Sequence, residues 1–165
     1  MKISSIQIFK SPISLTKPFV ISLGRFDHAL NVAVLIHTDS GITGTGECSP
    51  FMSINGENMD TCFIVGQYLA KGLHGRDPLM IEDCIRRMDE VIYGNASIKS
   101  AFDMALYDIA AQHQNLPLYA FLGGKKSKKI FTDYTVSIGE AGQMAKDAVV
   151  IKEKGFPVIK VKLGG

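Results

Sequence analysis

The run Val158-Ile159-Lys160-Val161-Lys162-Leu163 near the end of the chain alternates apolar and basic side chains, as a β-strand does. A helical pattern rich in Ala, Val and Ile precedes this run over residues 139–154 and ends at Gly155. Before that helix, residues 130–138 form a second strand pattern with Thr, Tyr and Val. Strand, helix and strand at this spacing predict a β-α-β unit, whose two strands are parallel. The end of the chain is therefore expected to open an α/β domain.

Strand patterns also occupy the first part of the chain, at residues 3–8, 31–38 and 42–47. The turn residues Asp39-Ser40-Gly41 separate the last two strands and predict a hairpin. Continuous regular structure is not expected at residues 11–30, which connect the first two strands and contain Pro12, Pro18 and Gly24.

Three helices are expected to follow these strands. The first covers residues 59–73, and the second runs from Pro78 to about residue 92. The third has apolar side chains at three- and four-residue steps, with a cap at Asn95 or Ser97 and its end marked by Pro117. A three-stranded antiparallel meander followed by helices is an α+β arrangement, and it extends to about residue 125.

Composition narrows the functional classes. The 165 residues are 46% hydrophobic and 21% charged, as in an ordinary globular protein, and no apolar run is long enough for a membrane helix. The net charge is +2, and four of the positive charges lie in one lysine run at residues 125–129. A nucleic-acid partner is not expected, because a basic face with interleaved aromatic residues is missing. The lysine run is interpreted as a solvated linker.

The cysteines Cys48, Cys62 and Cys84 are odd in number and form no C-x-x-C pair. Free thiols in a reducing cytoplasm are therefore expected, without a disulfide framework or a zinc site. The chain stops directly after an apolar strand that needs neighbours, which predicts that these residues are part of a longer protein.

Two other features have simple structural interpretations. The segment Gly44-Thr45-Gly46-Glu47 lacks the lysine of a phosphate-binding loop, so a structural turn with Glu47 bonded to the backbone is expected. The four histidines are scattered without metal-ligand spacing, so no metal ligand is assigned in this chain.

Lys160 and Lys162 are the best candidates for chemistry. Alternate residues of a strand share a face, so the two side chains point the same way, about 6–7 Å apart. On an exposed edge strand both would simply face water. On the inner face of a barrel, near the C-terminal end of a strand, they would lie where such enzymes place catalytic groups. Arg25 has two interpretations as well, a solvated loop arginine or a bidentate clamp on a substrate carboxylate.

Five segments taken together resemble one family. They are Gly-Thr-Gly-Glu-Cys-Ser-Pro at 44–50, Ala-Leu-Tyr-Asp-Ile-Ala-Ala at 105–111, Pro-Leu-Tyr-Ala-Phe-Leu-Gly-Gly at 117–124, Thr-Asp-Tyr-Thr-Val-Ser-Ile at 132–138 and Ile-Lys-Val-Lys-Leu-Gly at 159–164. In this order they resemble the muconate-lactonising (mandelate racemase/muconate lactonizing enzyme) subgroup of the enolase superfamily. Within it they are most similar to the dipeptide epimerases, the relatives of L-Ala-D/L-Glu epimerase.

The resemblance implies an N-terminal capping domain at residues 1–125 and the first β-α-β of a (β/α) TIM-type barrel at residues 126–165. It implies that Lys162 is the acid/base on one face of the substrate α-carbon. Lys160 would help to neutralise the carboxylate as it becomes an enediolate. Thr135 would border the substrate, and two capping loops at residues 16–30 and about 49–58 would supply the specificity side through Arg25, Phe19 and Ile54.

The implied reaction is Mg²⁺-dependent epimerisation of a dipeptide at the α-carbon of its C-terminal residue. The resemblance places the Mg²⁺ ligands and the opposite-face lysine in later barrel strands, and it implies a homo-oligomer for the full-length protein. The 165 residues alone are expected to be catalytically incomplete. Two alternatives stay open: an o-succinylbenzoate synthase or muconate-type cycloisomerase of the same superfamily, and a non-catalytic binding or assembly module.

Overall fold

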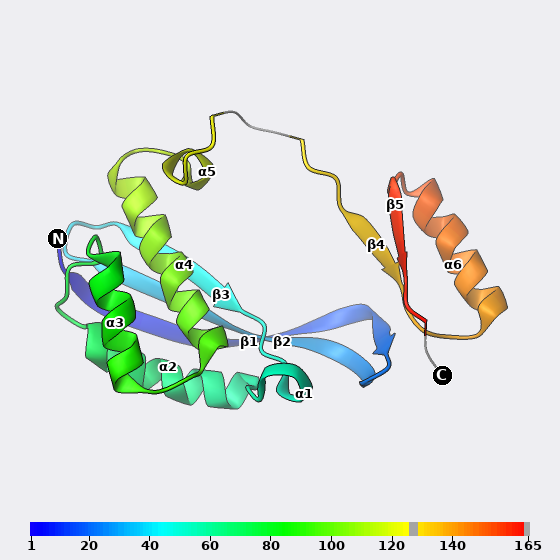
Figure 1. Ribbon diagram of the computed structural model, residues 1–165, viewed down its shortest axis with the longest axis horizontal. Coiled ribbons are helices and arrows are strands. Elements are labelled where there is room, and N and C mark those ends of the chain that lie inside the picture. The colour runs from blue at the N-terminus through cyan, green and yellow to red at the C-terminus, as the bar shows by residue number, and fades with distance from the viewer. Residues whose placement is uncertain (126–128, 164–165) are drawn as a thin grey trace. The chain divides into compact units, whose positions relative to one another are not determined.

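The computed structural model describes residues 1–125 and 129–163 (Figure 1). The described residues divide into two compact units, one made of residues 1–13 and 30–125 and the other of residues 14–29 and 129–163. Residues 126–128 of the expected lysine linker lie outside the described residues, as do the last two glycines. No helix in the described part of the chain is long and apolar enough to cross a membrane.

A three-stranded sheet with strand order β1-β2-β3 underlies the first unit. Strand β1 spans Ile3–Ile21, β2 spans Gly24–Thr38 and β3 spans Thr43–Cys48. β2 and β3 are antiparallel with Val34 opposite Gly46, which confirms the expected hairpin. From Val32 onward every second residue of β2 is buried, so one face of the sheet lines the core.

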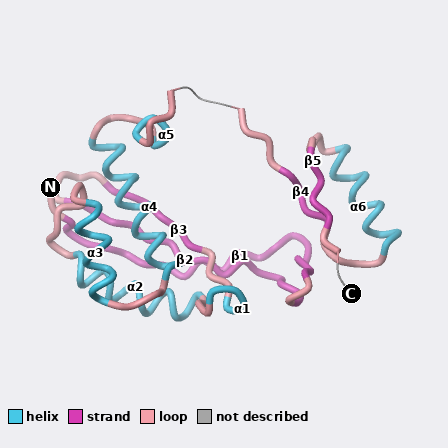
Figure 2. The backbone as a smooth tube through the Cα atoms, in the orientation of Figure 1, coloured by secondary structure: helices cyan, strands magenta, loops and turns pink. Residues whose placement is uncertain are grey.

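The expectation of irregular structure at residues 11–30 is wrong. β1 and β2 continue through this segment as a long two-stranded ribbon (Figure 2). β1 tolerates Pro12 and Pro18 because it is an edge strand, where a missing N–H on the free side removes no ladder hydrogen bond. Gly24 follows the turn that reverses the ribbon, and its φ of 133° is accessible because glycine has no Cβ.

Helices α2 (Met59–Leu73), α3 (Ile81–Val91) and α4 (Ala96–His113) form the other layer of the first unit (Figure 1). α2 has the expected bounds, and a capping box between Asn58 and Thr61 starts it. α3 begins later than expected, because the Asp77 carboxylate accepts the Leu79 N–H (3.0 Å) and forms a turn before the helix. Two short helices, α1 (Met52–Asn55) and α5 (Leu118–Phe121), flank these three.

The expected side-chain cap of α4 is also wrong. Asn95 occupies the N-cap position, but it adopts a left-handed conformation with φ 57°, and its side chain makes no capping bond. Its amide instead donates to the carbonyl oxygen of Tyr93 (2.9 Å). The Ser97 N–H donates to the side chain of Glu57, which lies forty residues earlier in the chain.

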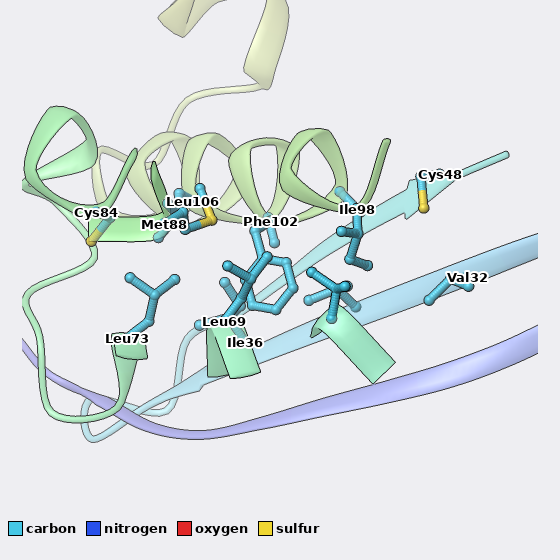
Figure 3. Packing of buried hydrophobic residues seen from close by; sticks show 14 of the residues in the cluster. Val32, Ile36, Cys48, Leu69, Leu73, Cys84, Met88, Ile98, Phe102 and Leu106 are labelled. Carbon is cyan, nitrogen blue, oxygen red and sulfur yellow. The ribbon is translucent and has the colours of Figure 1, made fainter. Parts of the chain in front are cut away.

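The core of the first unit is centred on the large apolar residues of α4. Phe102 is fully buried and points toward Leu69 of α2 and Ile36 of β2 (Figure 3). The same cluster joins all three strands of the sheet to all three long helices, and its other largest members are Ile3, Leu73, Met88, Ile98, Leu106, Ile109, Val32 and Val34. The core therefore lies between the sheet and its helical layer.

The Gly44–Glu47 segment lies in strand β3, so its interpretation as a turn is wrong. A Cβ on Gly44 would overlap the carbonyl oxygen of Ala105, and one on Gly46 would overlap that of Ala101. The two glycines thus allow β3 to lie directly on α4. Glu47 accepts a hydrogen bond from the side-chain amide of Asn31 (2.8 Å), not from the backbone.

The second unit contains β4 (Asp133–Val136), α6 (Ala141–Glu153) and β5 (Val158–Val161), and its two strands are parallel. The predicted β-α-β unit is therefore confirmed, with shorter strands than expected. Glu140 caps α6 by accepting the Gln143 N–H (3.0 Å), and hydrogen bonds from backbone N–H groups lower the pKa of Glu140. The expected fold class, an antiparallel meander with helices followed by the first β-α-β of a barrel, matches what the structure shows.

The three cysteines are free and buried, and they give a prediction for alkaline solutions. Burial raises the pKa of the Cys84 thiol to about 11, because desolvation disfavours the thiolate. An unfolded thiol ionises near pH 8.5–9. The contribution of the neutral Cys84 thiol to the stability of the folded protein is therefore fully present below that pH, and it is lost as the pH rises toward 11. Melting curves at pH 8 and pH 10.5 should therefore show a larger alkaline decrease in Tm for the unsubstituted protein than for Cys84→Ala. Equal decreases would contradict the prediction.

Candidate active site

The two lysines lie at the C-terminal end of β5, next to β4. Thr135 of β4 is the register partner of Lys160, and the backbone N–H of Lys162 donates to the Val136 carbonyl (3.2 Å). The hydrogen-bonded ladder therefore continues one residue past the last strand residue. Since alternate residues share a face and register partners lie side by side, Thr135, Lys160 and Lys162 lie on one face of the two strands.

The opposite face of the two strands is apolar. Tyr134 packs edge-to-face on Phe156, with 5.0 Å between ring centroids. Val136 is buried, and so is Ile151 of α6, the helix that connects the two strands. The helix therefore belongs to the apolar face, and the lysine face is free of it. Lys160 is exposed and Lys162 is half-buried.

The tip of the β1–β2 ribbon, residues 14–29, belongs to the same compact unit as the two lysines. The backbone N–H of Ile138, just beyond the C-terminal end of β4, donates to the carbonyl of Val20 (3.1 Å). Lys17 and Asp147 of α6 form an exposed ion pair at 3.6 Å. Phe19 lies between these two anchor points in the sequence, next to Val20, whose carbonyl oxygen accepts this bond from just beyond the end of β4.

Arg25 also lies in this ribbon tip, and its side chain is 65% exposed. Its Nε and one terminal nitrogen contact the same carboxylate oxygen of Asp27, at 3.3 and 3.2 Å. An exposed ion pair of this kind contributes about 0–1 kcal/mol. The guanidinium can therefore exchange Asp27 for another carboxylate at little cost.

Ile54 lies in the other compact unit, on the short helix α1, and its side chain is 73% exposed. An apolar side chain displayed in this way can contact a ligand.

No metal site is formed by residues 1–125 and 129–163, since no three His, Cys, Asp or Glu side chains among them lie together as a ligand set. These described residues by themselves therefore supply no ligand set for a Mg²⁺ ion.

Sequence reasoning missed the residues that hold these segments in place. Lys17, Asp147 and Glu57 showed no local signal, because each contacts a partner far away in the sequence. Such pairs become visible only once the strands and helices are placed. Of the sequence-predicted residues, the structure brings together Thr135, Lys160 and Lys162.

Comparison with known proteins identifies the class of protein that this fold defines. Residues 3–123 match the N-terminal domain of mandelate racemase/muconate lactonizing enzymes, and the chain belongs to this family. The resemblance to this subgroup of the enolase superfamily, inferred from the ordered motifs, is confirmed.

Within this family, the chain is similar to individual enzymes whose activities are known by name. The chain is 64% identical, over its whole length, to the D-Ala-D/L-Ala epimerase of Cytophaga hutchinsonii, and it is 38% identical, over 99% of its length, to the L-Ala-D/L-Glu epimerase of Bacillus subtilis. A crystal structure of the Cytophaga hutchinsonii dipeptide epimerase with Mg and D-Ala-L-Val matches with a TM-score of 0.97 at 64% identity, covering all of this chain and 45% of that one. The chain spans 45% of the length of each of these relatives.

Proposed function

We propose that the full-length protein is a dipeptide epimerase, which inverts the α-carbon of the C-terminal residue of its substrate. The observation that carries the proposal is the pair Lys160 and Lys162, on the helix-free face at the ends of two parallel strands. High identity to a D-Ala-D/L-Ala epimerase along the whole chain supports it. The relatives reported above are epimerases, which favours removal and return of a proton over elimination or lactone chemistry.

Lys162 is assigned to proton transfer on one face of the α-carbon. As a neutral amine it takes the α-proton, the C–H bond breaks, and the electron pair moves into the carboxylate to form an enediolate. A proton is then returned from the opposite face, by an acid outside these 165 residues. The enediolate carries concentrated negative charge, and the Lys160 ammonium beside it lowers the energy of that charge. Thr135, the register partner of Lys160, borders the substrate on the same face.

Arg25, Phe19 and Ile54 are assigned to substrate selection. Phe19 is held at the end of β4 by the anchored ribbon tip, and Arg25 can offer its guanidinium to an acidic side chain. Ile54 supplies an exposed apolar contact from helix α1. The dipeptides accepted would therefore depend on the two segments at residues 16–30 and 49–58.

Arg25→Ala is expected to lower the activity toward dipeptides with an acidic C-terminal residue selectively. A charge-assisted hydrogen bond contributes about 1.5–3 kcal/mol, so kcat/KM for L-Ala-L-Glu should decrease roughly ten- to a hundredfold. The kcat/KM for a dipeptide with an alanine side chain at the same position should change little. Steady-state kinetics with both substrates measure the two kcat/KM values, and an equal decrease for both would contradict the role of Arg25.

The remaining features of the proposal concern the whole protein. We propose Mg²⁺ dependence with ligands outside the described residues, as Mg is present in the crystal structure of the Cytophaga hutchinsonii enzyme. The boundary near residue 125 between a capping domain and a barrel domain stays a proposal, as does self-association. The three buried free thiols support a location in the cytoplasm, where thiols stay reduced.

A panel of dipeptides, each offered as a single stereoisomer to the full-length gene product with Mg²⁺, tests the proposed function. Chiral chromatography should show the second stereoisomer at the C-terminal residue, and chelation of the metal should abolish its appearance. If no dipeptide yields an epimer and the protein instead eliminates water from a substrate or forms a lactone, the result would support the alternative hypothesis of an o-succinylbenzoate synthase or a cycloisomerase. No turnover by the full-length protein would favour a binding module.

A further inference from the structure

Helix α4 begins without a cap of its own. Its N-cap residue Asn95 makes no capping bond, and its first turn contains no acidic residue. The first N–H groups of a helix have no intrahelical partner, and the helix dipole adds positive potential at that end. Without a partner from elsewhere in the chain, the N-terminal end of this 18-residue helix would be unsatisfied and electropositive.

Glu57 supplies the missing negative charge. Its side chain accepts the Ser97 N–H at both carboxylate oxygens, at 3.0 and 3.2 Å. The residue is only 7% exposed, and among the described residues only Thr38 is another buried polar or charged residue. Cys62 adds a thiol contact at 3.5 Å. A buried carboxylate is costly unless it is hydrogen-bonded, so this geometry holds Glu57 firmly to the end of α4.

Asn55 fastens the same segment at a second point. Its side-chain amide donates to the hydroxyl of Ser97 (2.7 Å). Its side-chain oxygen accepts the N–H groups of Phe51 (3.3 Å) and Glu57 (3.1 Å), which closes the segment on itself. Ser97 therefore binds Asn55 through its hydroxyl and Glu57 through its N–H.

Helix α1 is held on the end of α4 by these two attachments. It has four residues, and none of them is buried, so apolar packing contributes little to its position. Ile54 directly precedes Asn55 and is exposed. Fixing Asn55 and Glu57 on the end of α4 consequently fixes where the Ile54 side chain is displayed.

We propose that Glu57 and Asn55 are positioning residues that hold α1, and with it Ile54, in place for substrate selection. This role rests on the proposed function only in so far as Ile54 contacts the substrate. The attachment of α1 to the end of α4 is a property of the first compact unit. The two parts can therefore be tested separately.

Amide hydrogen exchange of the full-length protein without substrate tests the attachment. Exchange at residues 51–57 should become faster in Glu57→Ala and in Asn55→Ala, whereas Glu57→Gln, which keeps an acceptor oxygen, should change it less. Lys99→Ala is the matched control, because Lys99 lies near the start of the same helix and its ammonium group donates to Asp89 (2.8 Å) and to the Ile92 carbonyl (2.7 Å), not to α1. Unchanged exchange in Glu57→Ala, or equal acceleration in Lys99→Ala, would overturn the proposal.

Kinetics then test the role in selection. Glu57→Ala should raise KM for the preferred dipeptide about tenfold with little change in kcat, because a displaced Ile54 weakens binding without touching the reacting atoms. In an Ile54→Ala background the same change should have little further effect, since the contact is already gone. A full additive effect in that background would overturn the link to Ile54. Absence of dipeptide turnover in the unsubstituted protein would instead refute the proposed function and leave the exchange result to decide the attachment.

Discussion

Lys162→Ala in the full-length gene product is expected to lower kcat roughly a thousandfold, with KM changed much less. General acid–base catalysis by a positioned side chain contributes about 10²–10⁴ in rate, and alanine has no group that could take the proton. Because Lys162 is assigned to one face of the α-carbon, the loss of α-proton exchange should be greater for one substrate epimer than for the other. Proton NMR in D₂O, starting from each epimer separately, measures the two rates.

Lys146→Ala is the matched control for this substitution. Lys146 is an exposed lysine of α6, so it belongs to the same compact unit but not to the lysine face of the strands. Its replacement should leave both exchange rates unchanged. Small and equal losses from both epimers in Lys162→Ala would contradict the assignment of Lys162 as the acid/base.

Gly46→Ala is expected to have the largest effect on stability. A Cβ at this position would overlap the Ala101 carbonyl oxygen and lie 2.8 Å from the Ala101 carbonyl carbon, and both atoms belong to the backbone of α4. A backbone carbonyl cannot rotate away as a side chain can, so β3 must separate from α4 and open the core between them. Overpacking typically costs about 1–3 kcal/mol, and a backbone clash belongs at or above the top of that range.

Thermal unfolding of the two proteins measures this cost, and Gly139→Ala provides the control. At Gly139 the nearest atom to an added Cβ is Met144 Cγ at 3.9 Å, which is ordinary van der Waals contact. Gly46→Ala should therefore unfold at a much lower temperature or fail to fold, while Gly139→Ala should stay close to the unsubstituted protein. Similar melting temperatures for both variants would show that β3 does not lie directly on α4.

The parts of the fold that the sequence predicts correctly are those with strong local periodicity. Helix α2 has its predicted bounds because its apolar pattern is regular, and in the structure a capping box starts it at the predicted residue. The β-α-β unit follows from two short strand patterns around one helical pattern. Lys160 and Lys162 could be placed on a common face, because two-residue spacing in a strand leaves no other arrangement.

The parts that the sequence does not predict depend on contacts between distant residues. Pro12 and Pro18 argue against a strand locally, but an edge strand tolerates them, and edge position is a property of the whole sheet. Gly44 and Gly46 indicate a turn when read alone, yet their function is to admit helix α4 at close range. The cap of α4 comes from Glu57, forty residues before Ser97, so no local motif could have indicated it.

The central claim is that the full-length protein removes and returns the α-proton of a dipeptide. Incubation of the unsubstituted full-length protein with Mg²⁺ and single stereoisomers of alanine- and glutamate-ended dipeptides in D₂O tests it most directly, with the α-proton signals followed by NMR. We predict that deuterium enters the α-carbon of the C-terminal residue of at least one dipeptide, accompanied by its epimer, while the α-carbon of the N-terminal residue keeps its proton. Absence of deuterium at the C-terminal α-carbon across the whole panel would contradict the claim.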